Sequence, residues 1–130
     1  MIVVDASALI EVLLRTPAAR AVESRLFAPG QTLHAPHLLD IEVAQVIRRY
    51  AAKGEIDGER GRVALGDLAD LRMQRYPHDF LLPRVWALRN NITACDAVYV
   101  ALAEALDAVL LTRDRRLAGA GGHQARVEVV

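Results

Sequence analysis

The chain alternates short, wholly apolar runs with longer segments in which apolar residues return every three or four positions. The short runs have the length and the β-branched content of buried strands. The longer segments have the spacing of helices that bury one side. Strands are predicted at residues 2–4, 32–35, 75–78, 108–111 and 126–130, of which 75–78 is the weakest. Helices are predicted at residues 8–14, from Thr16-Pro17 to near Pro29-Gly30, from Pro36 to Gly54, after Asp57, around Pro83, from Thr93 to Leu106 and at 115–117.

Capping residues and buried faces refine three of these helices. Thr16-Pro17 has the pattern of an N-cap followed by a proline in the first turn. The helix capped by Asp57 is expected to bury Val63, Leu68 and Leu71. The helix that follows is expected to bury Trp86.

The order of the elements predicts the fold class. Because strands alternate with helices, neighbouring strands run parallel and helices cover the sheet. We therefore expect an α/β fold, a three-layer α/β/α sandwich with a short, mostly parallel central sheet. The 130 residues have the size of one domain and contain no repeat or interdomain linker, so residues 1–130 are expected to form a single domain.

Composition narrows the class of protein. With 53% hydrophobic and 25% charged residues, the chain resembles ordinary globular proteins. No run of about 18 uncharged apolar residues occurs, and Cys95 has no second cysteine to pair with, so we expect no membrane segment and a cytoplasmic location. The formal net charge of zero argues against bulk electrostatic binding of nucleic acid, although not against a local basic patch. Nearly all cations are arginines, which suit phosphate but are also explained by a GC-rich genome.

Four acidic residues are expected at one edge of the sheet. Asp5 directly follows the first strand, and Asp114 closely follows the fourth. The carboxyl ends of parallel strands meet at the edge where open α/β sheets bind their ligands. Glu42 lies early in the helix after the second strand, and Asp96 lies in the first turn of a strongly apolar helix. All four side chains are therefore expected to point toward this edge.

Each acid also has a structural interpretation. Asp5 is explained as a turn residue and Asp114 as a helix cap. Asp96 fits a capping box with Thr93, and Glu42 fits a solvated position near a helix N-terminus. If all four act in this way, the chain is a non-catalytic or regulatory α/β binding module.

Taken together, the acids raise an electrostatic problem that a metal ion solves. Two carboxylates about 4 Å apart repel by roughly 4 kcal/mol at an effective dielectric constant near 20. The only lysine, Lys53, falls at the far end of its helix. Mg²⁺ or Mn²⁺ takes carboxylate oxygens and keeps several waters. Zinc is disfavoured because the histidines show no ligand spacing and are expected on the surface or in loops: His34, His37, His78 and His123.

Four segments resemble a known family. In order, they are VVDASALIE, LLDIEVAQVIRR, ITACDAVYVALAE and LLTRDRRLA. They are similar to successive blocks of the PIN-domain ribonucleases, specifically the toxins of VapBC toxin–antitoxin pairs, and they span essentially the whole chain. The middle segment, residues 56–79, matches no block. The resemblance implies a PIN-like fold whose metal-site acids are Asp5, Glu42, Asp96 and Asp114, supported by the polar residues Ser7 and Thr112.

The resemblance also implies a reaction, which is endonucleolytic cleavage of RNA with Mg²⁺, for which Mn²⁺ substitutes. We expect Asp5 and Asp96 to bind the metal directly and Asp114 to bind it directly or through water. Glu42 is expected to be a ligand or to orient the attacking water. Asp40 is expected on the helix surface. The basic residues beside the site are expected to contact RNA phosphates, or else to form a solvated turn: Arg113, Arg115 and Arg116.

The resemblance implies partners as well. A small VapB-type antitoxin is expected to lay a flexible tail across a groove near the acids. A homodimer is expected because the resembled toxins pair, and because residues 38–47 and 80–86 carry more apolar surface than one small sheet needs. Two other α/β classes lack their signatures here. A receiver domain requires a lysine at a late strand end, and a haloacid-dehalogenase-type phosphatase requires Asp-x-Asp where this chain has Asp5-Ala6-Ser7.

Overall fold

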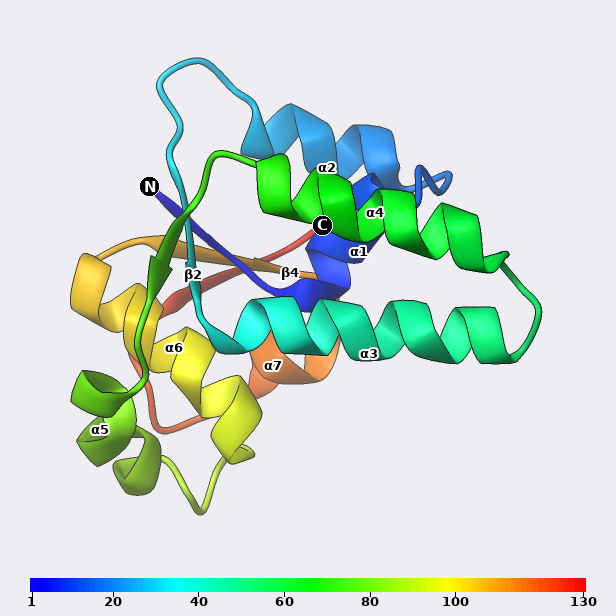
Figure 1. The fold of residues 1–130 in the computed structure, drawn as a ribbon. Coiled ribbons are helices and arrows are strands. Elements are labelled where there is room, and N and C mark those ends of the chain that lie inside the picture. Colours follow the sequence, from blue (N-terminus) through cyan, green and yellow to red (C-terminus); the bar gives the residue numbers. More distant parts are fainter.

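A parallel sheet forms the centre of the molecule (Figure 1). The computed structural model describes residues 1–130 and has a 5-stranded sheet in the order β3-β2-β1-β4-β5. Every neighbouring pair of strands is parallel, which confirms the predicted α/β class. The strands are β1 (Ile2–Val4), β2 (Leu33–Pro36), β3 (Gln74–Tyr76), β4 (Val109–Thr112) and β5 (Arg126–Val129).

Helices cover the sheet in two groups. The first group packs together and comprises α1 (Ala6–Leu13), α2 (Ala19–Leu26), α3 (Leu38–Ala52) and α4 (Gly58–Asp70). The second comprises the 3-10 turn η1 (Asp79–Leu81), α5 (Leu82–Ala87), α6 (Ala94–Leu106) and α7 (Arg115–Gly119). In Figure 1, α5 and α6 lie on the opposite side of the sheet from α1, α2 and α4. No helix is both long enough and apolar enough to span a bilayer.

The register of the central strands sets the position of the functional edge. Val4 pairs with Leu111, so β1 and β4 end side by side. The backbone N–H of Asp5 continues this ladder and donates to the carbonyl of Leu111 at 2.9 Å. β1 lies in the middle of the sheet and is buried on both faces, with Val3 and Val4 fully buried. The first polar residue after β1 is therefore delivered to the carboxyl edge by a rigid, buried strand.

The start of α2 differs from the prediction. α2 begins at Ala19 with Ala18 as its N-cap residue, not at Thr16-Pro17. The hydroxyl of Thr16 is hydrogen-bonded to the carboxylate of Glu11, so it does not cap α2. The chain reverses direction before this point through Arg15, whose φ is 54°. The helix consequently starts after the turn has closed.

Two expected core residues face outward instead. α4 buries Ala64 and Leu68, and Gly61 brings it so close to α3 that an added Cβ would lie 3.0 Å from a methyl group of Ile47. This close packing turns Val63 outward, and its exposed fraction is 40%. The expectation that Trp86 is buried is also wrong, since it is 68% exposed. The short helix α5 buries none of its own residues and is anchored by its buried neighbours Leu81 and Leu88.

His34 is likewise not a surface or loop residue. It lies in β2, whose residues are all buried because the strand has neighbours on both sides. Its ring nitrogens are hydrogen-bonded to the hydroxyls of Thr32 at 2.8 Å and Tyr76 at 2.7 Å. Burial lowers the pKa of His34, which therefore packs as a neutral, fully bonded core residue.

Candidate active site

Asp5 is fixed in place by hydroxyl groups from two different segments. Its Oδ2 accepts hydrogen bonds from Ser7 at 2.8 Å and from Thr112 at 2.6 Å. Asp5 occupies the N-cap position of α1, but its side chain makes no capping bond. The residue is 8% exposed, and no protein group binds Oδ1. Asp5 is thus a buried, oriented carboxylate with one oxygen left free to bind a ligand.

The two hydroxyls are themselves held by the turn after β4. The backbone N–H of Arg113 donates to Ser7 Oγ at 3.0 Å, and that of Asp114 donates to Thr112 Oγ1 at 3.0 Å. Each hydroxyl accepts from the backbone, so its own proton is directed at Asp5. Ser7 and Thr112 thus both contact Asp5, and their supporting role in a metal site stays a prediction.

Glu42 lies in the second turn of α3 and reaches across to α6. Its Oε1 accepts a hydrogen bond of 2.5 Å from the hydroxyl of Tyr99, a fully buried residue. Burial raises the pKa of Glu42, the Tyr99 bond opposes this shift, and the charges of Asp5 and Asp96 add to it. Glu42 is therefore not the solvated surface residue that the alternative interpretation of the sequence expected.

Asp96 lies in the first turn of α6, but another residue caps that helix. The N-cap is Thr93, whose hydroxyl accepts from the backbone N–H of Asp96 at 3.2 Å. The carboxylate of Asp96 makes no bond to the backbone N–H of Thr93, so the reciprocal half of a capping box is missing. Burial, followed by the charge of Asp5, raises the pKa of Asp96, while Thr93 and Arg116 oppose that rise. Thr93 supplies the cap, which leaves the carboxylate available at the edge.

Asp114 combines a structural role with its place at the edge. It is the N-cap of α7, where its Oδ1 accepts from the backbone N–H of Arg116 at 2.9 Å. The guanidinium of Arg116 lies 3.4 Å from Oδ2. Desolvation acts to raise the pKa of Asp114, but the bonds and charge of Arg116 outweigh it and lower the pKa. The capping interpretation is thus correct for Asp114 alone among the four acids.

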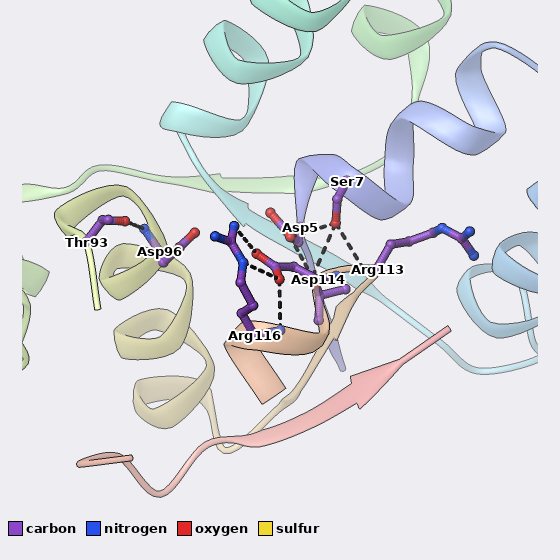
Figure 2. Close-up of polar contacts among 8 residues, drawn as sticks. Asp5, Ser7, Thr93, Asp96, Arg113, Asp114 and Arg116 are labelled. Carbon is purple, nitrogen blue, oxygen red and sulfur yellow. Dashed lines mark hydrogen bonds and ion pairs between the residues drawn. The ribbon is translucent and has the colours of Figure 1, made fainter. Parts of the chain in front are cut away.

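The acids converge on one region without forming a closed cage. In Figure 2 the carboxylates of Asp5, Asp96 and Asp114 face the same space, and the guanidinium of Arg116 lies between Asp96 and Asp114. One hollow of about 540 Å³ is lined in part by Asp96 and Asp114. A second hollow of about 400 Å³ is lined in part by Asp5 and Glu42. No three acidic, histidine or cysteine side chains approach closely enough to be a ready-made ligand group.

This donor set fits a hard divalent cation. It consists of carboxylate oxygens, and neither hollow is lined by a histidine or a cysteine. Mg²⁺ commonly binds through only one or two carboxylates and completes its shell with water and substrate phosphates. The space around the free Oδ1 of Asp5 is open, so it leaves room for the waters and phosphates that this mode of binding requires.

Comparison with known proteins decides the family. The PIN domain profile matches residues 2–122. The chain belongs to the PIN domain family. Ribonuclease VapC9 of Mycobacterium tuberculosis is 45% identical over 130 residues, covering 100% of this chain and 98% of that protein. Ribonuclease VapC12 of the same organism is 42% identical over 130 residues, covering 100% of this chain and 99% of that protein.

A solved structure supports the fold of this PIN domain. The chain matches the crystal structure of VapBC2 from Rickettsia felis bound to a DNA fragment from their promoter, with a TM-score of 0.70. The match covers 99% of this chain and 98% of that chain at 14% sequence identity, which supports the fold and nothing further. The predicted PIN-like, three-layer architecture is confirmed.

The three arginines predicted near the site lie in different places. Arg116 lies among the acids, whereas the side chain of Arg113 points away from them (Figure 2). Arg113 donates to the carbonyl of Val130 at 2.8 Å and lies 3.7 Å from Glu11. Arg115 is exposed and forms no ion pair. Asp40 pairs with Arg75 at 2.8 Å on the helix surface, as expected.

Tyr99 is the member of the site that the sequence analysis missed. It lies three residues after Asp96 on α6, so the two share one face of that helix. This spacing is the feature of the sequence that could have indicated that Tyr99 lies near Asp96. The partner of its hydroxyl is 57 residues away in the sequence, and an apolar helix gives no indication of which tyrosine binds a carboxylate.

Proposed function

We propose that this PIN domain is an endoribonuclease toxin of the VapC type that hydrolyses RNA phosphodiester bonds with Mg²⁺, for which Mn²⁺ substitutes. The observation that carries the proposal is the fixed, partly unbound carboxylate of Asp5 beside three further acids, in a chain 45% identical to Ribonuclease VapC9. A hydrolytic metal site needs this combination of oriented oxygens and open space.

Asp5 and Asp96 would hold the metal directly, and Asp114 would hold it directly or through water. A bound divalent cation would lower the pKa of a coordinated water and neutralise charge on the phosphate. The protein's own contributions follow from its contacts. Ser7 and Thr112 keep Asp5 in a single orientation. Glu42, held by Tyr99, orients the attacking water or accepts its proton.

The proposed reaction is an in-line hydrolysis. The water oxygen forms a new bond to phosphorus, the bond from phosphorus to the 3′-oxygen breaks, and the departing oxygen takes up a proton. The products are a 5′-phosphate and a 3′-hydroxyl. Arg116 is placed to contact the phosphate, because its exposed guanidinium already lies among the acids and is held by long contacts of 3.4 Å.

Cleavage of end-labelled RNA tests this proposal. We expect cleavage that EDTA abolishes and that added Mg²⁺ or Mn²⁺ restores, with 5′-phosphate ends on the products. Asp5→Asn should remove activity and weaken Mn²⁺ binding measured by calorimetry. Asp107→Asn is the matched control, because Asp107 is a 99% exposed carboxylate at the opposite end of α6. Cleavage that persists in EDTA, or full activity in Asp5→Asn, would refute the metal site.

We further propose that the toxin acts in the cytoplasm and is restrained by a VapB-type antitoxin. A peptide segment with an arginine or lysine suits the acidic edge, since a cation there replaces the charge of the metal. Such a tail and Mn²⁺ should weaken each other's binding. Calorimetric titration of an antitoxin tail peptide with and without saturating Mn²⁺ tests this, and equal affinities would show that the tail only blocks access.

We also propose a homodimer. Ile41 on α3 is 69% exposed, and the η1–α5 segment exposes Phe80 and Leu82 at 52% and 56%. Large exposed apolar side chains are typical of an interface between subunits. The dimer should be visible by light scattering at micromolar concentration.

A further inference from the structure

We propose that the hollow between the α5–α6 loop and α7 is a nucleobase-binding subsite, in which Arg89, Asn90 and Asn91 select the nucleotide next to the scissile phosphate. The inference rests on the proposed ribonuclease function. The hollow measures about 540 Å³, which lies within the range of about 300–1,000 Å³ typical of small-ligand sites. Asp96 and Asp114 form part of its wall, so a base bound there belongs to a nucleotide at the cleavage site.

The two asparagines provide unused hydrogen-bonding groups. Asn90 and Asn91 are consecutive, exposed residues in the α5–α6 loop, and both line the hollow. Neither carboxamide is hydrogen-bonded to another protein group. A carboxamide offers one acceptor and two donors in a plane, which is the pattern needed to read the edge of an unpaired base. The loop therefore places base-reading groups directly beside the catalytic acids.

The position of Asn91 is set by its packing against the loop before β5. A Cβ atom added to Gly122 would lie 2.8 Å from Asn91 Oδ1, so the side chain occupies the space that a larger residue would fill. Gly122 has a φ of 84°, a conformation that favours glycine. Its carbonyl accepts from Arg84 at 3.1 Å, which ties this loop to α5. Asn91 is thereby held in position before any ligand arrives.

Arg89 adds a flat, charged surface to the same hollow. Its guanidinium lies 4.6 Å from the ring centroid of Trp86, and Nη1 donates to the carbonyl of Trp86 at 3.0 Å. The stack restrains a side chain that is otherwise flexible. RNA-binding proteins use guanidinium planes as platforms on which unstacked bases lie. Trp86 thus acts as the support of Arg89, which accounts for its place on the outer face of α5.

Apolar groups complete the subsite. Ile92, Leu117 and Ala120 line the hollow together with the polar residues. Ile92 packs against the core, and Leu117 is buried, so these side chains form a firm surface. A base has an apolar face and a polar edge, and the hollow offers partners for both. Single-stranded RNA is the ligand whose chemistry matches this combination.

Mapping the cleavage sites in a random RNA pool tests the inference. Asn90→Ala and Asn91→Ala should each reduce the preference for one nucleotide beside the cut by about tenfold, because a well-placed pair of base contacts contributes about 1–3 kcal/mol of discrimination. Arg89→Gln should raise KM about tenfold on all sequences with little change in kcat. All three variants should bind Mn²⁺ as the wild type does. Gln74→Ala and Arg72→Gln, exposed residues at the amino end of β3, are the matched controls and should change neither quantity.

A second measurement needs no substitution in the hollow. Adding a single-stranded oligoribonucleotide to the Asp5→Asn protein should shift the side-chain amide resonances of Asn90 and Asn91 in NMR spectra. Unshifted resonances, or an unchanged cleavage preference in both asparagine variants, would overturn the subsite while leaving the ribonuclease proposal intact. A wild-type protein that cleaves no RNA would instead overturn the proposed function, and the subsite with it.

Discussion

At the start of α6, substitution of Asp96 is expected to reduce RNA cleavage, and substitution of Thr93 is expected to reduce the free energy of unfolding. Thr93 carries the capping bond, through its hydroxyl and the backbone N–H of Asp96 at 3.2 Å. Asp96→Asn leaves that bond intact and removes one charge from a repulsive cluster. The variant should therefore be as stable as the wild type or more stable by up to about 1 kcal/mol, the repulsion of two charges 4 Å apart in water. Thr93→Ala removes the cap and should lower the free energy of unfolding by about 1 kcal/mol.

The two substitutions should differ in their effect on activity. Replacing a residue that hydrogen-bonds to a metal ligand costs about 10- to 100-fold in metal affinity or activity, so loss of Asp96, itself a proposed ligand, should reduce cleavage at least about a hundredfold. Thr93→Ala should retain most of the activity at temperatures where the protein is folded. Thr93→Ser restores a hydroxyl cap and should restore stability.

Thermal melts and RNA cleavage on the same preparations measure both effects. A loss of about 1 kcal/mol corresponds to a fall in melting temperature of about 4 °C for a domain of this size. The reasoning is refuted if Asp96→Asn is destabilised by 2 kcal/mol or more, since the carboxylate would then be a structural cap. It is equally refuted if that variant cleaves RNA as fast as the wild type.

Further predictions concern the neighbouring acids and the proposed interface. Tyr99→Phe removes the bond to Glu42 and should lower the free energy of unfolding by about 2 kcal/mol in melts, while raising the pKa of Glu42 further. Asp5→Asn should lower the pKa values of Glu42 and Asp96, because the charge of Asp5 raises both, and NMR titration of the side-chain carboxyl carbons would detect this. Because folding raises the pKa of Glu42, acidification through that pKa should stabilise the wild type relative to Glu42→Gln in pH-dependent melts. Phe80→Glu should convert a dimer into a monomer by light scattering, whereas a wild type that is already monomeric would exclude this interface.

The sequence predicted those parts of the fold that depend on local pattern. The buried strand β1 and the apolar helix α6 are continuous apolar runs, and such runs have one stable location, inside the protein. The edge position of Asp5 and Asp114 follows from the parallel sheet, because strand ends must lie together once the strands pair. The location of these two acids was therefore predictable from topology.

Features that depend on the rotation of one element against another were not predictable. Val63 and Trp86 are apolar residues at helical spacing. Rotating either helix about its axis by the angle of one residue is enough to move such a side chain from the core to the surface. Close packing at Gly61 sets that rotation in α4, and Leu81 and Leu88 set it in α5. His34 was misplaced because its two hydrogen-bond partners compensate for burial, and one of them lies 42 residues away.

The contacts of the acids distinguish those that could bind the proposed metal directly from one that would bind it through water. Asp5 has an unbound oxygen, and the carboxylate of Asp96 does not cap its helix, so both can bind without breaking a structural bond. Asp114 differs, because its carboxylate caps α7 and is paired with Arg116. Direct coordination by Asp114 competes with both contacts, whereas a bridging water preserves the cap. We therefore expect Asp114 to contact the proposed metal through water, an arrangement that would leave Arg116 free to contact an RNA phosphate.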